Sequence, residues 1–258
     1  MAAVASIAGL LALGGGRGWG SLWVVAAVGA GQLAIGWGND YLDRERDRAA
    51  ERSDKPLATG AVAPSVVRNS ALVALAACIP LSLASGVPST LVHLGAIGSA
   101  FAYNAGLKRS PWSPLPYAFS FGLAPAIVSL GLTPSRWPHA WVLAAAALLG
   151  IAGHFTQVLP DIDVDRAQGS RGLPQLLGAR PSAIAAGAML LAATAIVTFG
   201  PGRTASPLGL IGLSAAVLLT GVLVAAALAD RLRLAFRLTL VVALVAVAAF
   251  LAGGGRTL

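Results

Sequence analysis

The chain has 258 residues, of which 57% are hydrophobic and only 11% are charged, and its mean hydropathy is +0.78. These values exclude an ordinary soluble domain and predict an all-α polytopic membrane protein with one domain over residues 1–258. The net charge of +8 at pH 7 would suggest nucleic acid for a soluble protein. Here we expect no nucleic-acid partner, because an excess of basic residues on one side is typical of membrane loops.

Hydropathy, charge and Gly/Pro breaks predict nine transmembrane helices, several of them close to the ~20 residues that cross a bilayer. The first is short, and we interpret it as a span that lacks residues upstream rather than as a signal peptide, since a basic n-region is missing. A single cysteine in an apolar run, Cys78, excludes a disulfide framework. The predicted spans are 1–16, 20–39, 61–84, 88–107, 114–132, 138–160, 179–199, 206–229 and 232–252.

The charges predict how these spans are oriented. If the N-terminus is cytoplasmic, four basic residues fall outside, which leaves 14 of the 18 basic residues and all ten acidic residues on the cytoplasmic side. The four are Arg17, Arg136, Arg203 and Arg256. We therefore expect an integral protein of a bacterial plasma membrane, with its charged end, and any site there, facing the cytoplasm.

The first of two acidic segments follows the span 20–39. Asp40, Asp43 and Asp47 are spaced i, i+3 and i+7, and Asn39 precedes them. On a helix these positions share one face. Carboxylates are costly in so apolar a chain, so a stripe of three predicts a site rather than chance.

The second acidic segment follows the span 138–160. Asp161 and Asp165 are spaced i and i+4, which would place them together on an extension of that helix, while Asp163 would point elsewhere. Oxygen ligands without His or Cys partners favour Mg²⁺, which is usually held by a few carboxylates and by phosphate oxygens of a substrate. We therefore predict a Mg²⁺ site and a phosphorylated ligand. The predicted metal ligands are Asp40, Asp43, Asp47, Asp161 and Asp165.

Basic residues follow both acidic segments and also end the fourth span. If the second, fourth and sixth spans meet, these cations and Mg²⁺ would surround a diphosphate. The alternative is that the Arg/Asp alternation over 43–52 is a solvated helix face with local ion pairs, but this does not explain the second segment. The basic residues are Arg44, Arg46, Arg48, Arg52, Lys55, Lys108, Arg109, Arg166 and Arg171.

Four blocks in this order resemble the UbiA-type intramembrane prenyltransferases, and the resemblance covers nearly the whole chain. The matching positions are Asn39, Asp40, Asp43 and Asp47 in an NDxxDxxxD segment, Lys55, Pro56, Leu57 and Gly60 in a basic-Pro-Leu-x-x-Gly stretch, Tyr103, Lys108 and Arg109 in a Tyr-x-x-x-x-Lys-Arg signature, and Asp161, Asp165, Gly169 and Leu173 in a second acidic motif. The chain departs from the pattern at Pro160, where many relatives have a polar residue, and at Gly172, where Thr is common. The usual Arg near the start of the first span is also absent.

The resemblance implies a central cavity, open to the cytoplasmic face and to lipid, in which Mg²⁺-dependent ionisation of an allylic (poly)prenyl diphosphate is followed by prenyl transfer to an acceptor. We expect a small lipophilic or aromatic acceptor, either an aromatic compound or a quinone precursor. To catalysis we assign Asp40, Asp43, Asp161, Asp165 and Lys108. To substrate binding we assign Asn39, Arg44, Lys55, Tyr103, Asn104, Arg109, Gln157, Arg166 and Arg171.

Three alternatives stay open at this point. The same fold is compatible with a phosphosugar acceptor or with no acceptor, as in a terpene cyclase. A phosphosugar would require cationic residues beyond those named, and the sequence does not reveal a surplus. A transporter or cation channel belongs to a different class, and it is disfavoured because no acidic residue lies at the middle of a predicted span.

Overall fold

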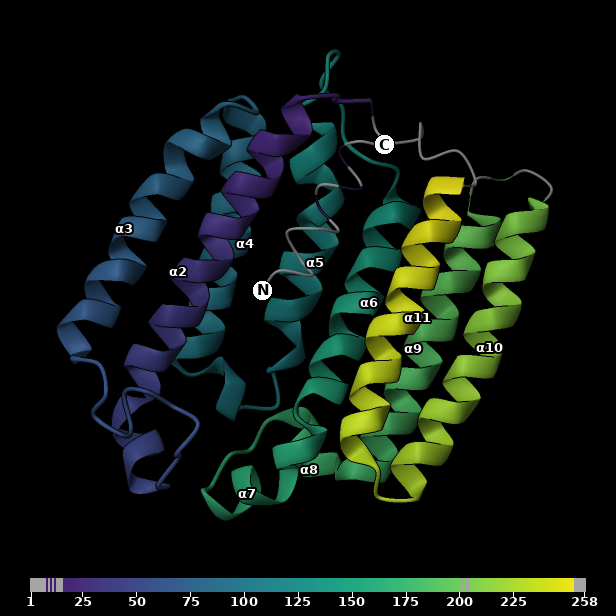
Figure 1. Cartoon of the computed structure of the whole chain (residues 1–258). Coiled ribbons are helices and arrows are strands. Elements are labelled where there is room, and N and C mark those ends of the chain that lie inside the picture. Colours follow the sequence, from purple (N-terminus) through teal and green to yellow (C-terminus); the bar gives the residue numbers. More distant parts are fainter. Residues whose placement is uncertain are drawn as a thin grey trace.

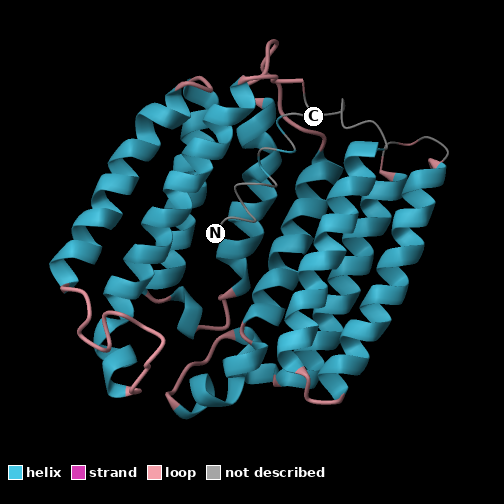
Figure 2. Ribbon diagram, viewed as in Figure 1, coloured by secondary structure: helices cyan, strands magenta, loops and turns pink. Residues whose placement is uncertain are grey.

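The computed structural model describes residues 8, 10, 12, 16–200, 202 and 205–252. Every regular element in that part of the chain is a helix (Figure 2), which confirms the predicted all-α class. The long helices run back and forth between the two ends of one bundle (Figure 1). They are α2 (Gly20–Ala49), α3 (Pro64–Leu83), α4 (Val87–Ala105), α5 (Pro114–Ser129), α6 (Ala140–Gln157), α9 (Ala179–Phe199), α10 (Pro207–Leu228) and α11 (Leu232–Ala252).

Short helices gather at one end of the bundle, where the C-terminal part of α2 and the α10–α11 connection also lie (Figure 1). We call this the polar end, because both acidic segments belong to it. The short helices are η1 (Leu107–Arg109), η2 (Leu159–Asp161), α7 (Ile162–Ala167) and α8 (Leu173–Leu177).

Proline sets where several long helices begin. Pro64 and Pro207 are the first residues of α3 and α10, and Pro114 is the first residue of α5. A proline in the first turn removes only an N–H group that has no partner within the helix. At α10 the Ser206 hydroxyl also accepts a hydrogen bond from the Gly209 N–H at 3.0 Å, so the helix start is capped as well.

Small residues let the helices approach closely. A Cβ at Gly187 of α9 would lie 2.9 Å from the Thr220 methyl group of α10, and one at Gly212 of α10 would lie 2.9 Å from Ala249 Cβ of α11. Close packing of this kind substitutes for the hydrophobic effect between helices in lipid. The bundle of α6, α9, α10 and α11 that results fixes the position of the second acidic segment.

The predicted count of nine spans is not confirmed. Six stretches in the described part of the chain are long and apolar enough to cross a membrane: α2, α3, α6 with its extension to Ala167, α9, α10 and α11. The helix α5 is apolar but shorter, and α4 carries His93, Tyr103 and Asn104 among its apolar residues. The first predicted span, 1–16, lies largely outside the described residues. Six helices and an apolar composition still make this an integral membrane protein.

The charge distribution generates a prediction about topology. Single cysteines introduced at the exposed positions Ser53 and Ala167, in a Cys78→Ala background, should react with a membrane-impermeant thiol reagent from the cytoplasmic side of intact vesicles. A cysteine at Ser135 should react from the opposite side only, because it lies at the other end of the bundle. Labelling of positions 53 and 167 from different sides would contradict this orientation.

Candidate functional site

The helix α2 carries the first acidic segment beyond the predicted end of its span and stops only at Ala49. The Lys108 ammonium group donates a hydrogen bond to the Asp43 carboxylate at 2.5 Å. The side chain of Asp43 is only 13% exposed and that of Lys108 only 11%. Lys108 also donates to the Asn39 side-chain oxygen at 2.9 Å. The single ammonium group of η1 thus joins the end of α4 to the acidic face of α2.

Because the ion pair is buried, it affects both the pKa of Lys108 and the stability of the fold. Desolvation lowers the pKa of Lys108 from its ordinary value of 10.5, and the hydrogen bond with Asp43 acts in the opposite direction. Arg109 adds a more distant contact, with its guanidinium 3.7 Å from the other Asp43 oxygen. Removing one partner of a buried pair leaves an uncompensated charge, which typically costs about 3–5 kcal/mol.

A second lysine reaches the same acidic stripe from the loop after α2. The Lys55 ammonium lies 2.6 Å from an Asp40 oxygen, and both side chains are about one-third exposed. The buried Leu57 anchors this loop. A hollow of about 260 Å³ opens beside the pair, lined by Asp40, Asp47, Lys55 and Trp37 and by apolar residues of α3.

The predicted helical extension through Asp161 is wrong in its geometry. The helix α6 ends at Gln157, and a 3₁₀ turn over Leu159–Asp161 separates it from α7. Pro160 explains the break, because it lacks the N–H group that an α-helix would bond to the carbonyl group four residues earlier. Asp161 is exposed and Asp165 is half-buried, so the two carboxylates do not continue one helix face.

Arg46 connects the two acidic segments. Its guanidinium donates to an Asp165 oxygen at 3.0 Å and to the Gln168 side-chain oxygen at 2.7 Å. The other Asp165 oxygen accepts from the Gln175 amide at 2.9 Å. An arginine of α2 and a glutamine of α8 therefore hold the second segment beside the first. We predicted Arg46 only as one of the cations around the ligand, and no sequence motif includes Gln175.

A hydroxyl group fixes the loop that follows the second segment. Ser113 Oγ accepts from the Leu173 backbone N–H at 3.0 Å and shares a hydrogen bond with His154 Nε2, also at 3.0 Å. A Cβ at Gly172 would lie 2.9 Å from the Lys108 carbonyl oxygen and closer still to the Gln175 side chain. Glycine at position 172 thus lets the loop pack directly against the backbone of Lys108.

Aromatic residues form a cluster above this cation-rich layer. The Tyr103 ring meets Tyr117 edge-on, with centroids 5.1 Å apart, and Tyr117 stacks on His154 at 4.6 Å. The Tyr117 hydroxyl donates to the Gln157 side-chain oxygen at 3.2 Å. The buried Asn104 instead donates to the Ile35 carbonyl oxygen at 3.2 Å, so its amide ties α4 to α2.

Other predicted site residues lie toward solvent. Arg44 pairs with its exposed neighbour Glu45 at 3.0 Å and donates to the Tyr41 carbonyl oxygen at 2.8 Å, as the local ion-pair alternative expects. Arg166 and Arg171 are exposed. Arg52 is held by Asp54 at 2.8 Å; this hydrogen bond raises the pKa of Arg52, with smaller contributions from Asp161 and Asp47. The loop after α2 thus lies within electrostatic reach of the second segment.

The donor chemistry fits the predicted Mg²⁺. No group of three or more His, Cys, Asp or Glu residues within the described part of the chain is close enough to form a ready-made metal site. Magnesium does not require one, since it typically takes one or two carboxylates and completes its shell with water and phosphate oxygens. Asp40 and Asp43 offer carboxylate oxygens of this kind, and each forms an ion pair with a lysine in the structure.

Comparison with known proteins gives a family match over most of the chain and solved structures with the same fold. The model of the UbiA prenyltransferase family matches residues 1–233. A UbiA homolog from Aeropyrum pernix K1 superposes with a TM-score of 0.77 at 20% identity, over 96% of this chain and 97% of the other. A UbiA homolog from Archaeoglobus fulgidus bound to GPP and Mg²⁺ superposes with a TM-score of 0.68 at 19% identity, over 98% and 96%.

The relatives that match by sequence are prenyltransferases whose names indicate two different acceptors. Digeranylgeranylglyceryl phosphate synthase from Natronomonas pharaonis is 33% identical over 64% of this chain and 61% of its own length. The 4-hydroxybenzoate octaprenyltransferase from Pseudomonas putida is 31% identical over 54% of this chain and 48% of its own length. The chain therefore spans about three fifths or less of these relatives.

The packing at Gly172 generates a testable prediction. Gly172→Thr should lower the free energy of unfolding by ~1–3 kcal/mol, because the added side chain overpacks the contact with the Lys108 backbone. Gly98→Thr is the matched control, since a Cβ at Gly98 meets nothing within 4 Å. Thermal unfolding of both purified variants measures the difference. Equal stability of the two would show that the loop does not depend on this contact.

Proposed function

The chain belongs to the UbiA prenyltransferase family, and from that membership we propose that it transfers a prenyl group from an allylic prenyl diphosphate to a lipophilic acceptor. The observation that carries the proposal is the layer of carboxylates and cations at the polar end, in which Lys108 contacts Asn39 and Asp43 and Arg46 contacts Asp165. Such a layer at the end of an apolar bundle suits a ligand with a diphosphate head and a hydrocarbon tail.

The reaction breaks the bond between the allylic carbon and the diphosphate oxygen, and the electron pair leaves with the oxygen. The acceptor's nucleophile then forms a bond to the allylic carbon and loses a proton. Negative charge therefore grows on the leaving diphosphate, and fixed cations stabilise the transition state more than the ground state. Mg²⁺, when bound, supplies further charge neutralisation at the diphosphate oxygens.

We propose that the lysines change partners when the donor binds. Asp40 and Asp43 would hold Mg²⁺, which would neutralise charge on the diphosphate, and Lys55 and Lys108 would donate to the diphosphate oxygens. In this account the observed ion pairs keep the carboxylates and the lysines oriented for the donor. Asp161 is exposed within electrostatic reach of Arg52 and contributes from the opposite segment.

The allylic cation must be kept from water until the acceptor attacks. Tyr103 and Tyr117 lie between the cation-rich layer and the apolar body of the bundle, and the faces of aromatic rings attract positive charge. The Gln157 side chain, held by the Tyr117 hydroxyl, offers a polar group at the same level to orient the acceptor. An apolar bundle above these residues excludes solvent.

Two classes of acceptor are consistent with this arrangement. An aromatic or quinone-precursor acceptor is supported by the similarity to a 4-hydroxybenzoate octaprenyltransferase and by the aromatic cluster around Tyr117. A phosphorylated glyceryl lipid is supported by the similarity to digeranylgeranylglyceryl phosphate synthases and by arginines near Pro160 that the sequence motifs do not include. Prenyl transfer to each acceptor in turn, with the other absent, decides between them.

The metal proposal predicts the effect of the acidic residues. Asp40→Asn and Asp43→Asn should each lower kcat by about 10²–10³-fold, and EDTA should abolish activity of the unmodified protein. Glu45→Gln is the matched control, because Glu45 is an acidic residue of the same helix that is 79% exposed and contacts only Arg44 among the ion pairs of the described residues. Full activity in EDTA, or an equal loss in the control, would contradict the proposal.

A separate prediction concerns Lys108. Because leaving-group charge grows during ionisation, Lys108→Ala should lower kcat by about 10²–10³-fold, with a smaller change in KM for the prenyl diphosphate. Loss of the charge also leaves Asp43 with only the more distant Arg109 contact at 3.7 Å among the described residues, so thermal unfolding must be measured beside kinetics. An unchanged kcat would show that the residue is only a structural charge of the η1 turn.

The pKa of Lys108 adds a pH-dependent test. Burial lowers this pKa from 10.5, so the lysine loses its proton, and with it its attraction for Asp43 and for diphosphate, at a lower pH than an exposed lysine would. Activity should therefore decline on the alkaline side before pH 10.5. Lys108→Arg should move this decline to higher pH, because arginine stays protonated. If activity declines at the same alkaline pH in both proteins, the decline belongs to the titration of another group.

A further inference from the structure

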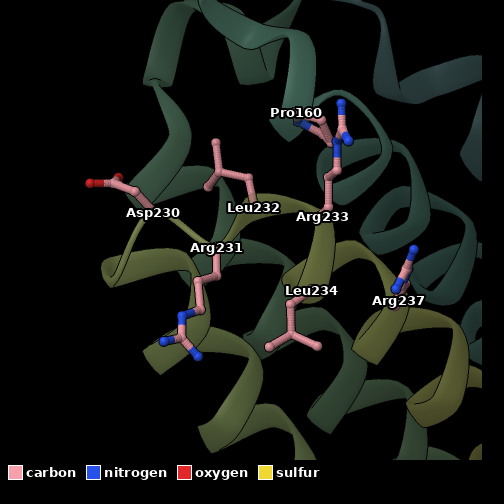
Figure 3. Close-up of a pocket in the computed structure, with 7 residues that line it drawn as sticks. All are labelled: Pro160, Asp230, Arg231, Leu232, Arg233, Leu234 and Arg237. Atoms are coloured by element: carbon pink, nitrogen blue, oxygen red, sulfur yellow. The ribbon is translucent and has the colours of Figure 1, made fainter.

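A second hollow at the polar end lies outside the carboxylate layer. It measures about 520 Å³ and lies between η2 and the α10–α11 turn. Figure 3 shows the residues that line it, which include Pro160, two leucines, one arginine of the α10–α11 turn and two arginines of the first turns of α11. The arginines are Arg231, Arg233 and Arg237.

The fold concentrates these arginines in one place. The turn between the helices is closed by a hydrogen bond from the Arg231 N–H to the Ala226 carbonyl oxygen at 2.8 Å. Arg233 and Arg237 are spaced i and i+4, so they share a face of α11. Figure 3 shows the Arg233 side chain beside Pro160 and Arg237 one turn further along the helix.

No ion pair within the described part of the chain involves these arginines. All three are exposed. The acidic residue in the hollow's lining is Asp230, and Figure 3 shows its carboxylate directed away from Arg233 and Arg237. Figure 3 shows the Arg231 guanidinium directed away from those of Arg233 and Arg237. Arg233 and Arg237, one helical turn apart, repel each other unless an anion binds between them.

The remaining lining defines the kind of anion. Leu232 and Leu234 contribute apolar surface beside the guanidinium groups, and Leu234 is 39% exposed. The hollow also lies where α11 enters its apolar stretch, which is the depth of lipid head groups. Guanidinium groups bind phosphate in a bidentate manner, and the leucines offer contact to the adjoining hydrocarbon. Free phosphate would leave that apolar surface bare.

We propose that this arginine hollow binds the phosphate group of a lipid. The site is distinct from the Lys108–Asp43 layer, although Pro160 borders the hollow and directly precedes Asp161. The lipid is either an anionic phospholipid of the membrane or a phosphorylated lipid acceptor. Both present the same phosphate chemistry to Arg233 and Arg237. Only the assignment to a phosphorylated acceptor rests on the proposed function.

Lipid retention by the purified full-length protein tests the site without requiring turnover. The protein is reconstituted in phosphatidylcholine nanodiscs that contain a small fraction of phosphatidic acid, and bound lipid is counted by native mass spectrometry. We expect preferential retention of phosphatidic acid by the unmodified protein. Arg233→Gln with Arg237→Gln should reduce it roughly tenfold to thirtyfold, since each basic residue near a lipid phosphate contributes about 1 kcal/mol.

The matched control removes the same charge elsewhere at the polar end. Arg68→Gln with Arg180→Gln changes two exposed arginines of α3 and α9 that do not line the hollow, and it should retain phosphatidic acid like the unmodified protein. Thermal unfolding verifies that both double variants are folded. Equal losses in the two double variants, or no preference for phosphatidic acid over phosphatidylcholine, would overturn the proposal.

Kinetics then distinguish the two sources of the lipid. If Arg233→Gln with Arg237→Gln raises KM for a prenylglyceryl phosphate acceptor and leaves KM for the prenyl diphosphate unchanged, the hollow holds the acceptor. If both KM values are unchanged while phosphatidic acid retention falls, the hollow holds a membrane phospholipid. Either result upholds the site. Normal phosphatidic acid retention by Arg233→Gln with Arg237→Gln would contradict the hollow, whatever the variant's prenyl transfer. Absence of prenyl transfer by the unmodified protein, with its lipid preference intact, would overturn the proposed function and leave the hollow standing.

Discussion

The ion pair between Lys108 and Asp43 is the constraint on which the rest of the polar end depends. Its side chains are 11% and 13% exposed, in a chain that offers few other charges, so each must be balanced where it lies. The pair fixes η1 against α2, and Gly172 then packs on the Lys108 backbone. Through this packing, the loop after the second acidic segment is held against the first. Two segments about 120 residues apart in the chain thus share one layer.

The layer and the bundle divide the chemistry between them. Cations and carboxylates at the polar end suit the charged head of a prenyl diphosphate, while the apolar helices suit its tail and exclude water. The aromatic cluster of Tyr103, Tyr117 and His154 lies at the boundary between the two. The arginine hollow at the start of α11 extends the cationic surface sideways toward the lipid, where a second phosphate-bearing molecule meets the protein.

The sequence was most informative where local periodicity decides structure. The helical character, the acidic stripe on α2 and the presence of cations after α4 followed from spacing and composition. Pro160 breaks the predicted helical extension, so Asp161 and Asp165 do not share a continuous helix. The roles of Arg46, Ser113 and Gln175 depend on contacts between distant segments, and no spacing reveals these. The same holds for Arg233 and Arg237, whose hollow exists only because α11 packs beside η2.

If the polar end is a diphosphate site whose carboxylates act through Mg²⁺, the protein's affinity for a prenyl diphosphate must depend on Mg²⁺. The most direct measurement is calorimetric titration of the protein with a non-ionisable prenyl thiodiphosphate, with and without Mg²⁺. We predict tight binding with Mg²⁺, markedly weaker binding without it, and loss of the Mg²⁺ effect in Asp43→Asn. Equal affinity with and without Mg²⁺, or a full Mg²⁺ effect in Asp43→Asn, would contradict it.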